Sequence, residues 1–162
     1  MIVYEMANKS TVEVSLKKKT AEIYVDGSFN NNIATFAWIA VENNQEIASN
    51  KGFSDNNEVL AHRQVWGEIT AVLDALRWCL ENKVKESFIF YDYAGLEAWS
   101  PNAKKPWAAN NDLTKRYKAE LNEICEKLTI NWLKVKSHSG NFWNEAVDKL
   151  AKSAYPEKTE IS

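Results

Sequence analysis

The chain has 162 residues, a length typical of one globular domain. A hydrophobic content of 45% with 26% charged residues excludes wholesale disorder, and a net charge of −2 argues against holding nucleic acid by bulk charge alone. No apolar run approaches the roughly 20 residues that span a bilayer, and residues 1–14 lack the continuous apolar core of a secretory signal. We therefore expect a cytoplasmic protein that does not enter a membrane.

The first part of the chain predicts three consecutive strands. Strand-like patterns cover 21–28 (AEIYVDGS), 33–41 and 45–53, and asparagine-rich turns separate them at 30–32 and 42–44. Because turns this short join antiparallel neighbours, we expect a three-stranded meander. The third strand is the most polar of the three, so we predict that it lies at an edge of the sheet.

Helices and strands alternate in the rest of the chain. Apolar residues repeat at helical spacing over 62–82 and 112–127, while 87–93 (SFIFYDY) is the continuously apolar kind of strand that is covered on both faces. The remaining expected elements are a short helix at 94–99, a loop at 100–111, a strand at 129–136 and a helix at 141–154. Right-handed crossovers make the last two strands parallel neighbours of the first. The prediction is an α/β fold with a mixed five-stranded sheet, three antiparallel strands then two parallel, and helices on both faces.

The cysteines and the local charge give two further expectations. Cys79 and Cys125 fall on the apolar stripes of predicted helices, which indicates buried free thiols. Between residues 104 and 136, eight lysine or arginine residues stand against four acids. This stretch is either one side of a phosphate-binding surface or a set of solvated helix faces, and the sequence leaves both interpretations open.

Four acidic residues occupy positions that this topology can bring together. Asp26 is expected to end the first strand, Asp92 to end the buried strand, Glu68 to lie early in the first long helix and Asp148 on the last helix. Sites in open sheets form at strand ends where the strand order reverses. Converging carboxylates repel one another unless a cation neutralises them, and an all-oxygen set suits Mg²⁺ or Mn²⁺. The alternative is that each acid is an exposed strand-end cap or turn former.

Four motifs in this order resemble type 1 ribonuclease H over about residues 20–155. They are YVDGS at 24–28, GEITAVLDAL at 67–76, FYDYAGLEAW at 90–99 and VKSHSGNFWNEAVDKLA at 135–151. The resemblance implies an RNase H-like fold whose catalytic carboxylates Asp26, Glu68, Asp92 and Asp148 bind two Mg²⁺ ions, with Mn²⁺ as a substitute. We expect residues 1–19 to be an N-terminal extension or linker, 20–155 the ribonuclease H catalytic domain and 156–162 a C-terminal tail.

The resemblance also implies the reaction. The expected enzyme is a monomeric endoribonuclease that hydrolyses the RNA strand of RNA–DNA hybrids and leaves 5′-phosphate and 3′-hydroxyl ends. His138 precedes the last helix on a Ser-His-Ser-Gly loop and would be a mobile proton carrier beside Asp148; a merely solvated loop histidine is the alternative.

Substrate contacts are expected on two sides of this site. Gly27, Ser28 and Gln64 are candidates for reading the 2′-hydroxyls of RNA, and Asn144 is the asparagine of the closing motif. The candidates for the DNA strand are Lys104, Lys105 and Trp107, together with Trp99 and Asn111. Trp99 has a core position as its alternative, and Trp38, Trp78 and Trp132 are assigned to the core.

The chain departs from the family at three places. Asp92-Tyr93-Ala94 replaces the usual Asp-Ser, HRQVWGE lacks the usual Asn-Asn, so that Arg63 or Gln64 would substitute, and the loop 100–111 has only KKPW. We therefore expect a weaker or differently placed grip on the substrate. Other interpretations are a catalytically silent hybrid- or RNA-binding domain of the same fold, an integrase or transposase core, and a structural interaction module.

Overall fold

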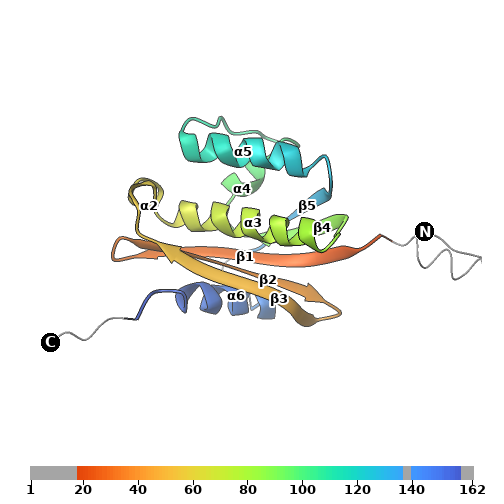
Figure 1. The fold of residues 1–162 in the computed structure, drawn as a ribbon, viewed down its shortest axis with the longest axis horizontal. Coiled ribbons are helices and arrows are strands. Elements are labelled where there is room, and N and C mark those ends of the chain that lie inside the picture. The colour runs from red at the N-terminus through yellow and green to blue at the C-terminus, as the bar shows by residue number, and fades with distance from the viewer. Residues whose placement is uncertain (1–17, 137–139, 158–162) are drawn as a thin grey trace, which may run out of the picture.

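The protein is seen in a computed structural model that describes residues 18–136 and 140–157. Five strands form one sheet in the order β3-β2-β1-β4-β5 (Figure 1). They are β1 (Thr20–Asn30), β2 (Ile33–Glu42), β3 (Gln45–Ser54), β4 (Glu86–Tyr91) and β5 (Thr129–Lys134). The first three pair antiparallel, whereas β4 is parallel to β1 and β5 is parallel to β4. The predicted mixed sheet is confirmed, with β3 at an edge and β5 one strand further from β1 than expected.

Both hairpins of the meander are made by asparagine pairs. Asn31 and Asn32 have φ of 52° and 64°, and Asn43 and Asn44 have φ of 53° and 59°. Two consecutive left-handed residues define the turn whose twist matches that of paired strands, and asparagine tolerates this conformation better than most residues. The turns predicted at 30–32 and 42–44 are therefore confirmed.

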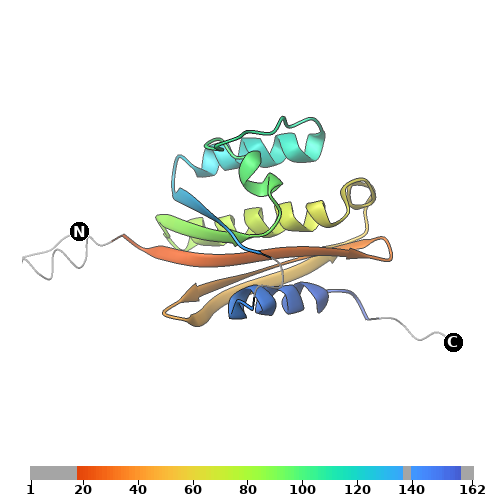
Figure 2. The same cartoon turned by 180° about the vertical axis from the view of Figure 1, so that it is seen from behind.

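The helices cover both faces of the sheet, as predicted. They are α2 (Asn57–His62), α3 (Gln64–Glu81), α4 (Gly95–Ala98), α5 (Asp112–Ile124) and α6 (Phe142–Lys152). The views from the front and from behind show α3, α4 and α5 on one side of the sheet and α6 alone on the other (Figures 1 and 2). Along the described residues, none of the helices combines the length and apolarity needed to cross a bilayer.

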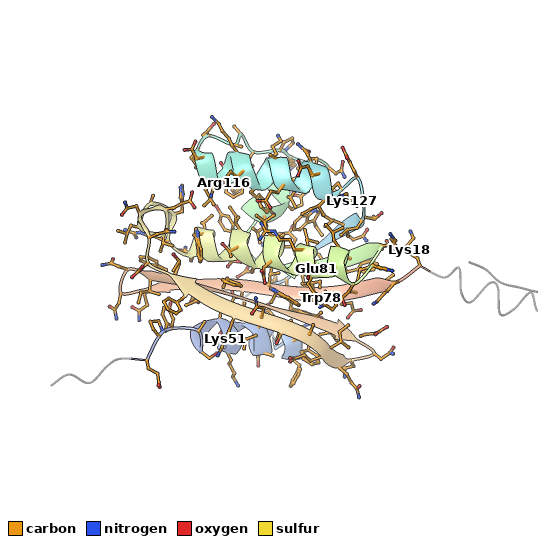
Figure 3. All side chains as sticks on the ribbon, viewed as in Figure 1. Lys18, Lys51, Trp78, Glu81, Arg116 and Lys127 are labelled. Atoms are coloured by element: carbon orange, nitrogen blue, oxygen red, sulfur yellow. The ribbon has the colours of Figure 1, made fainter. Side chains whose placement is uncertain are left out.

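The sheet separates two cores of unequal size. The larger one lies between the sheet and helices α3, α4 and α5, and includes Trp38 and the fully buried Tyr117. Trp78 (Figure 3) and Trp132, both predicted as core residues, are partly buried and pack against it. Cys79 is a buried free thiol as predicted, whereas Cys125 is free but only half-buried because α5 ends just before it.

The long helix predicted over 62–82 is wrong at its start. The chain forms two helices, α2 and α3, separated by Arg63 with φ 56° and ψ −131°. No glycine or proline marks this break, so the periodicity alone gave no sign of it. The local signal is Asn56, whose side chain accepts the Val59 N–H and caps α2.

Candidate active site

Two glycines allow strand β1 and helix α3 to touch. A Cβ on Gly27 would lie 2.5 Å from the backbone nitrogen of Glu68 and 2.7 Å from the carbonyl carbon of Gly67. A Cβ on Gly67 would collide with the carbonyl oxygen of Thr35 in β2. Only glycine fits at these positions, and the resulting close approach places the residue before Gly27 beside the residue after Gly67. Those residues are Asp26 and Glu68.

Asp26 lies within β1 and does not end it, which corrects the sequence-based expectation. The pairing of β1 with β4 ends at Tyr24 and Phe90, whereas its pairing with β2 continues to Asn30. Because β1 is also a hairpin arm, it runs on past the end of β4. In the register of the parallel pair, Asp26 is level with Asp92, the first residue after β4. The two acids therefore come to the same place at the rim of the parallel half of the sheet.

Helix α6 contributes the fourth acid from the opposite face. Asp148 is half-buried, interacts with Asp26 through a hydrogen bond and through charge, and forms an ion pair of 3.1 Å with Lys152 one turn later. Successive residues of β1 face opposite sides of the sheet, which explains this arrangement. Asp26 and Ser28 face α6, while Gly27 faces α3. Asp26 of β1 therefore interacts with both Glu68 of α3 and Asp148 of α6.

Burial and mutual repulsion perturb this group of carboxyls. Burial raises the pKa of Asp26 from 3.8 to about 7, and Asp148 adds to the rise through its hydrogen bond and its charge, while the Gly27 N–H opposes it. Burial raises the pKa of Glu68 well above its usual value, with further contributions from the charges of Asp26 and Asp92. At neutral pH the site therefore retains protons that exposed carboxyls would have lost.

The site is chemically suited to a hard cation. Glu68 Oε1 is fully buried and has no hydrogen-bond partner, which is costly for a carboxylate oxygen unless something else compensates it. Four carboxyls interact across it, and all-oxygen donors are those that Mg²⁺ prefers. Among residues 18–136 and 140–157, however, no three His, Cys, Asp or Glu side chains are arranged so that they could hold a metal ion as they stand. The unpartnered oxygen and the repulsion nevertheless show that the donor set fits a cation.

The residues predicted to contact RNA differ in their exposure and in the bonds that they already make. Gln64 is exposed at the start of α3, and its backbone carbonyl oxygen lies beside Gly27. Asn144 is half-buried in the first turn of α6. The hydroxyl of Ser28, in contrast, is bonded to Tyr155 and Thr35 within the protein. His138 lies outside the described residues.

The predicted contacts for the DNA strand lie on the connection that follows α4. Lys104 and Lys105 are exposed there, and the side chain of Trp107 is 43% exposed. The Trp107 ring packs edge-on against Tyr93 and Trp99, at centroid distances of 6.2 and 5.6 Å. Exposure leaves these residues available to a ligand.

Two other candidates for the DNA strand are structural residues. Trp99 is only 8% exposed and donates its indole N–H to the Ala108 carbonyl, so it belongs to the core and is no platform for a base. The Asn111 side chain accepts the Thr114 N–H at 2.9 Å and caps α5. In the basic stretch, Arg116 pairs with Glu58 at 2.9 Å and so joins α5 to α2 (Figure 3).

Tyr93 is a site residue that sequence reasoning did not select. It follows Asp92 directly, and burial raises its pKa with a further contribution from the charge of Glu68. Gly95 makes room for it, since a Cβ there would lie 2.5 Å from the Tyr93 ring. Its place after Asp92 was visible in the sequence, but it appeared there only as a departure from the family pattern.

Comparison with known proteins agrees with this architecture. The RNase H family model matches residues 18–155. The ribonuclease H of Pseudoalteromonas translucida is 35% identical over 150 residues, which covers 85% of this chain and 90% of that protein. RNase H1 from Halobacterium salinarum has the same fold, with a TM-score of 0.68 at 19% identity over 83% of this chain and 96% of that one.

A second solved structure extends the fold comparison. LC11-RNase H1, in complex with an RNA/DNA hybrid, superimposes with a TM-score of 0.67 at 12% identity and covers 83% of this chain and 95% of its own. The family match spans most of the sequence, and the relative from Pseudoalteromonas is similar along nearly its whole length. The chain therefore belongs to the RNase H family of enzymes.

Proposed function

We propose that this enzyme hydrolyses the RNA strand of RNA–DNA hybrids and leaves 5′-phosphate and 3′-hydroxyl ends. The observation that supports this most directly is the buried Glu68, whose Oε1 lacks a partner and whose carboxyl interacts with Asp26 and Asp92. The hybrid bound to LC11-RNase H1 supports the choice of substrate. The acids therefore support the reaction, and the family supports the substrate.

Asp26, Glu68, Asp92 and Asp148 are the residues proposed to hold two Mg²⁺ ions, for which Mn²⁺ would substitute. When bound, such ions make a water molecule nucleophilic at neutral pH and stabilise the departing 3′ oxygen. The chain itself contributes the spacing of Asp26 and Glu68, which depends on the Gly27–Gly67 contact. His138 is proposed to carry protons to and from the site beside Asp148.

The substrate is proposed to lie across the rim where β4 ends. Gly27, Gln64 and Asn144 would contact the RNA strand. The Ser28 hydroxyl is already bonded to Thr35 and Tyr155, so Ser28 would contact the RNA through its backbone. Lys104, Lys105 and Trp107 would contact the DNA strand from the connection after α4. We also propose that residues 20–155 form the catalytic domain, that residues 1–19 and 156–162 are accessory, and that the enzyme acts as a cytoplasmic monomer.

A panel of labelled duplexes tests the proposal. With Mg²⁺, the enzyme should cut the RNA strand of an RNA–DNA hybrid and leave single-stranded RNA, duplex RNA and duplex DNA intact. EDTA and the Asp92→Asn substitution should both abolish cleavage. End-labelling of the products should show a 5′-phosphate and a 3′-hydroxyl; a 2′,3′-cyclic phosphate end would contradict metal-dependent hydrolysis.

A catalytically silent hybrid-binding domain is the second candidate function. The observation in its favour is that the carboxyls of the described residues are not arranged to hold a metal ion as they stand. Binding of the hybrid without cleavage in either Mg²⁺ or Mn²⁺ would support this candidate and contradict the first.

A further inference from the structure

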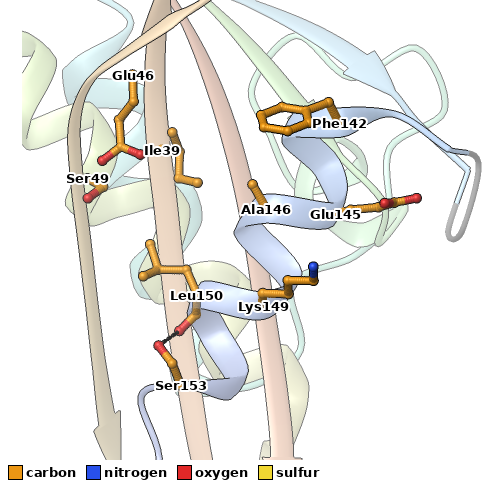
Figure 4. Close-up of a pocket in the computed structure, with 9 residues that line it drawn as sticks. All are labelled: Ile39, Glu46, Ser49, Phe142, Glu145, Ala146, Lys149, Leu150 and Ser153. Atoms are coloured by element: carbon orange, nitrogen blue, oxygen red, sulfur yellow. Dashed lines mark hydrogen bonds between the residues drawn. The ribbon is translucent and has the colours of Figure 1, made fainter.

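Helix α6 carries Asp148, yet few of its residues are buried against the sheet. Val147 and Ala151 are its fully buried residues, and they contact a small core on β1 and β2. An open groove of about 520 Å³ remains on one flank of the helix and is lined by Ile39 of β2 and Phe142 of α6, among others (Figure 4). Apolar burial alone therefore fixes this helix less firmly than it fixes α3.

Polar contacts attach α6 to the sheet near both of its ends. Before its first full turn is complete, the Trp143 indole N–H donates to Asn44 Oδ1 in the β2–β3 turn at 2.9 Å. After its last turn, the ammonium of Lys51 of β3 (labelled in Figure 3) donates to Ser153 Oγ, and the distance is 3.0 Å. Ser153 also donates its hydroxyl to the Leu150 carbonyl at 2.7 Å, as Figure 4 shows.

The hydroxyl of Tyr155 contacts β1, the strand that carries Asp26. It hydrogen-bonds to Ser28 Oγ at 2.8 Å, and Ser28 Oγ hydrogen-bonds in turn to Thr35 Oγ1 at 2.6 Å. Thr35 is completely buried, so its hydroxyl depends on partners within the protein. The three hydroxyls form one chain from β2 through β1 to the segment that follows α6.

We infer that Tyr155 is a positioning residue, which sets the distance between Asp148 and Asp26 and thereby the metal affinity of the site. Ser28 is two residues beyond Asp26 on the same face of β1, and Tyr155 is seven residues beyond Asp148, in the segment that follows the α6 C-cap Ser153. The bond thus joins the strand that carries Asp26 to the segment that directly follows the helix of Asp148. This inference rests on the proposed function, since it concerns the ligands of the same ions.

Removal of the Tyr155 hydroxyl alone tests the inference. The variant is Tyr155→Phe, and Tyr117→Phe is its matched control, because it also loses one tyrosine hydroxyl bond, at 2.7 Å to the Leu96 carbonyl, in the core on the other side of the sheet. The first measurement is the Kd for Mg²⁺ by titration calorimetry at a temperature at which circular dichroism shows each variant folded. The second is amide hydrogen exchange along α6 without metal.

Tyr155→Phe should weaken Mg²⁺ binding at least about threefold, in line with the loss of one hydrogen bond, and should speed exchange along α6. Tyr117→Phe should lower the free energy of unfolding and leave the Kd for Mg²⁺ unchanged. Ser28→Ala should reproduce the effect of Tyr155→Phe, and the double variant should be no worse than either single one.

Two outcomes would overturn the inference. An unchanged Kd in Tyr155→Phe, with normal binding by the wild type, would show that the hydroxyl does not position Asp148. An equal loss of affinity in Tyr155→Phe and Tyr117→Phe would show a general effect of destabilisation. If the wild type itself bound no Mg²⁺, the proposed function would fail and the inference would fail with it. Failure of the inference alone is distinguishable, because the wild type then binds Mg²⁺ normally.

Discussion

The metal-free enzyme should become more stable when Asp26 is replaced by Asn. In the folded state the pKa of Asp26 is raised from 3.8 to about 7, chiefly by burial and then by Asp148. Between these two values the folded chain retains a proton that the unfolded chain has lost, so stability falls as the pH rises through this window and levels off above it. Asparagine has no charge to bury, and Asp26→Asn therefore removes this penalty.

The size of the effect follows from the shift. Three pH units at about 1.4 kcal/mol each give about 4 kcal/mol above pH 7 as an upper value. Solvent near the site and the shared protons of Glu68 reduce this figure, so we expect a gain of about 1–3 kcal/mol at pH 8. For a chain of this size that corresponds to a Tm higher by about 3–10 °C. The gain should shrink to about 0.5 kcal/mol or less at pH 4, because this pH lies close to the unfolded pKa of 3.8 and the folded carboxyl is protonated.

Urea unfolding in EDTA, followed by tryptophan fluorescence at pH 8 and pH 4, measures the effect. Asp55→Asn, which alters an exposed aspartate between β3 and α2, is the control and should change the free energy of unfolding by less than about 0.5 kcal/mol. A variant no more stable than wild type at pH 8 would refute the reasoning. So would a gain of equal size at both pH values, because it could not come from the titration of Asp26.

Three other predictions follow from the same structure. Gly67→Ala should lower the free energy of unfolding by more than about 2 kcal/mol in a urea titration, because its Cβ would collide with the Thr35 carbonyl; wild-type stability would show that β1 and α3 do not touch. The Kd for Mg²⁺ should weaken as the pH falls below about 7, since binding must displace the protons held by Asp26 and Glu68, and calorimetry in buffers of different ionisation enthalpy should detect their release. Arg116→Ala breaks an exposed pair with Glu58 and should cost about 1 kcal/mol or less, a difference that high salt should remove; a larger, salt-independent loss would mean that the arginine has another role.

Local sequence patterns predicted most of the fold. Asparagine doublets fixed both hairpin turns because few other residues tolerate two consecutive positive φ values. The alternating and helical periods gave the order of the elements, and right-handed crossovers then gave the parallel strands. The break at Arg63 was not predictable in this way, because arginine seldom adopts a positive φ and no glycine or proline marks the position.

The site was predictable in its acids but not in its geometry. The sequence placed Asp148 on its helix and Asp92 within one residue of the end of its strand. It put Asp26 at a strand end, because the length of β1 depends on its pairing with β2. The Gly27–Gly67 contact joins residues 40 positions apart, and the Tyr155–Ser28 bond joins residues 127 apart. Contacts at such separations leave no periodic signal, so only the folded structure could show them.

The most direct test of the central claim is single-turnover cleavage of an RNA–DNA hybrid by Glu68→Gln. Glutamine has the same shape, but it replaces a buried carboxyl that interacts with Asp26 and Asp92. With saturating Mg²⁺, the rate should fall by about 1,000-fold or more, equivalent to about 4 kcal/mol, while the Kd for the hybrid changes by less than about threefold. A variant that cleaves within about tenfold of the wild-type rate would contradict the account, because Glu68 would then not belong to the metal site.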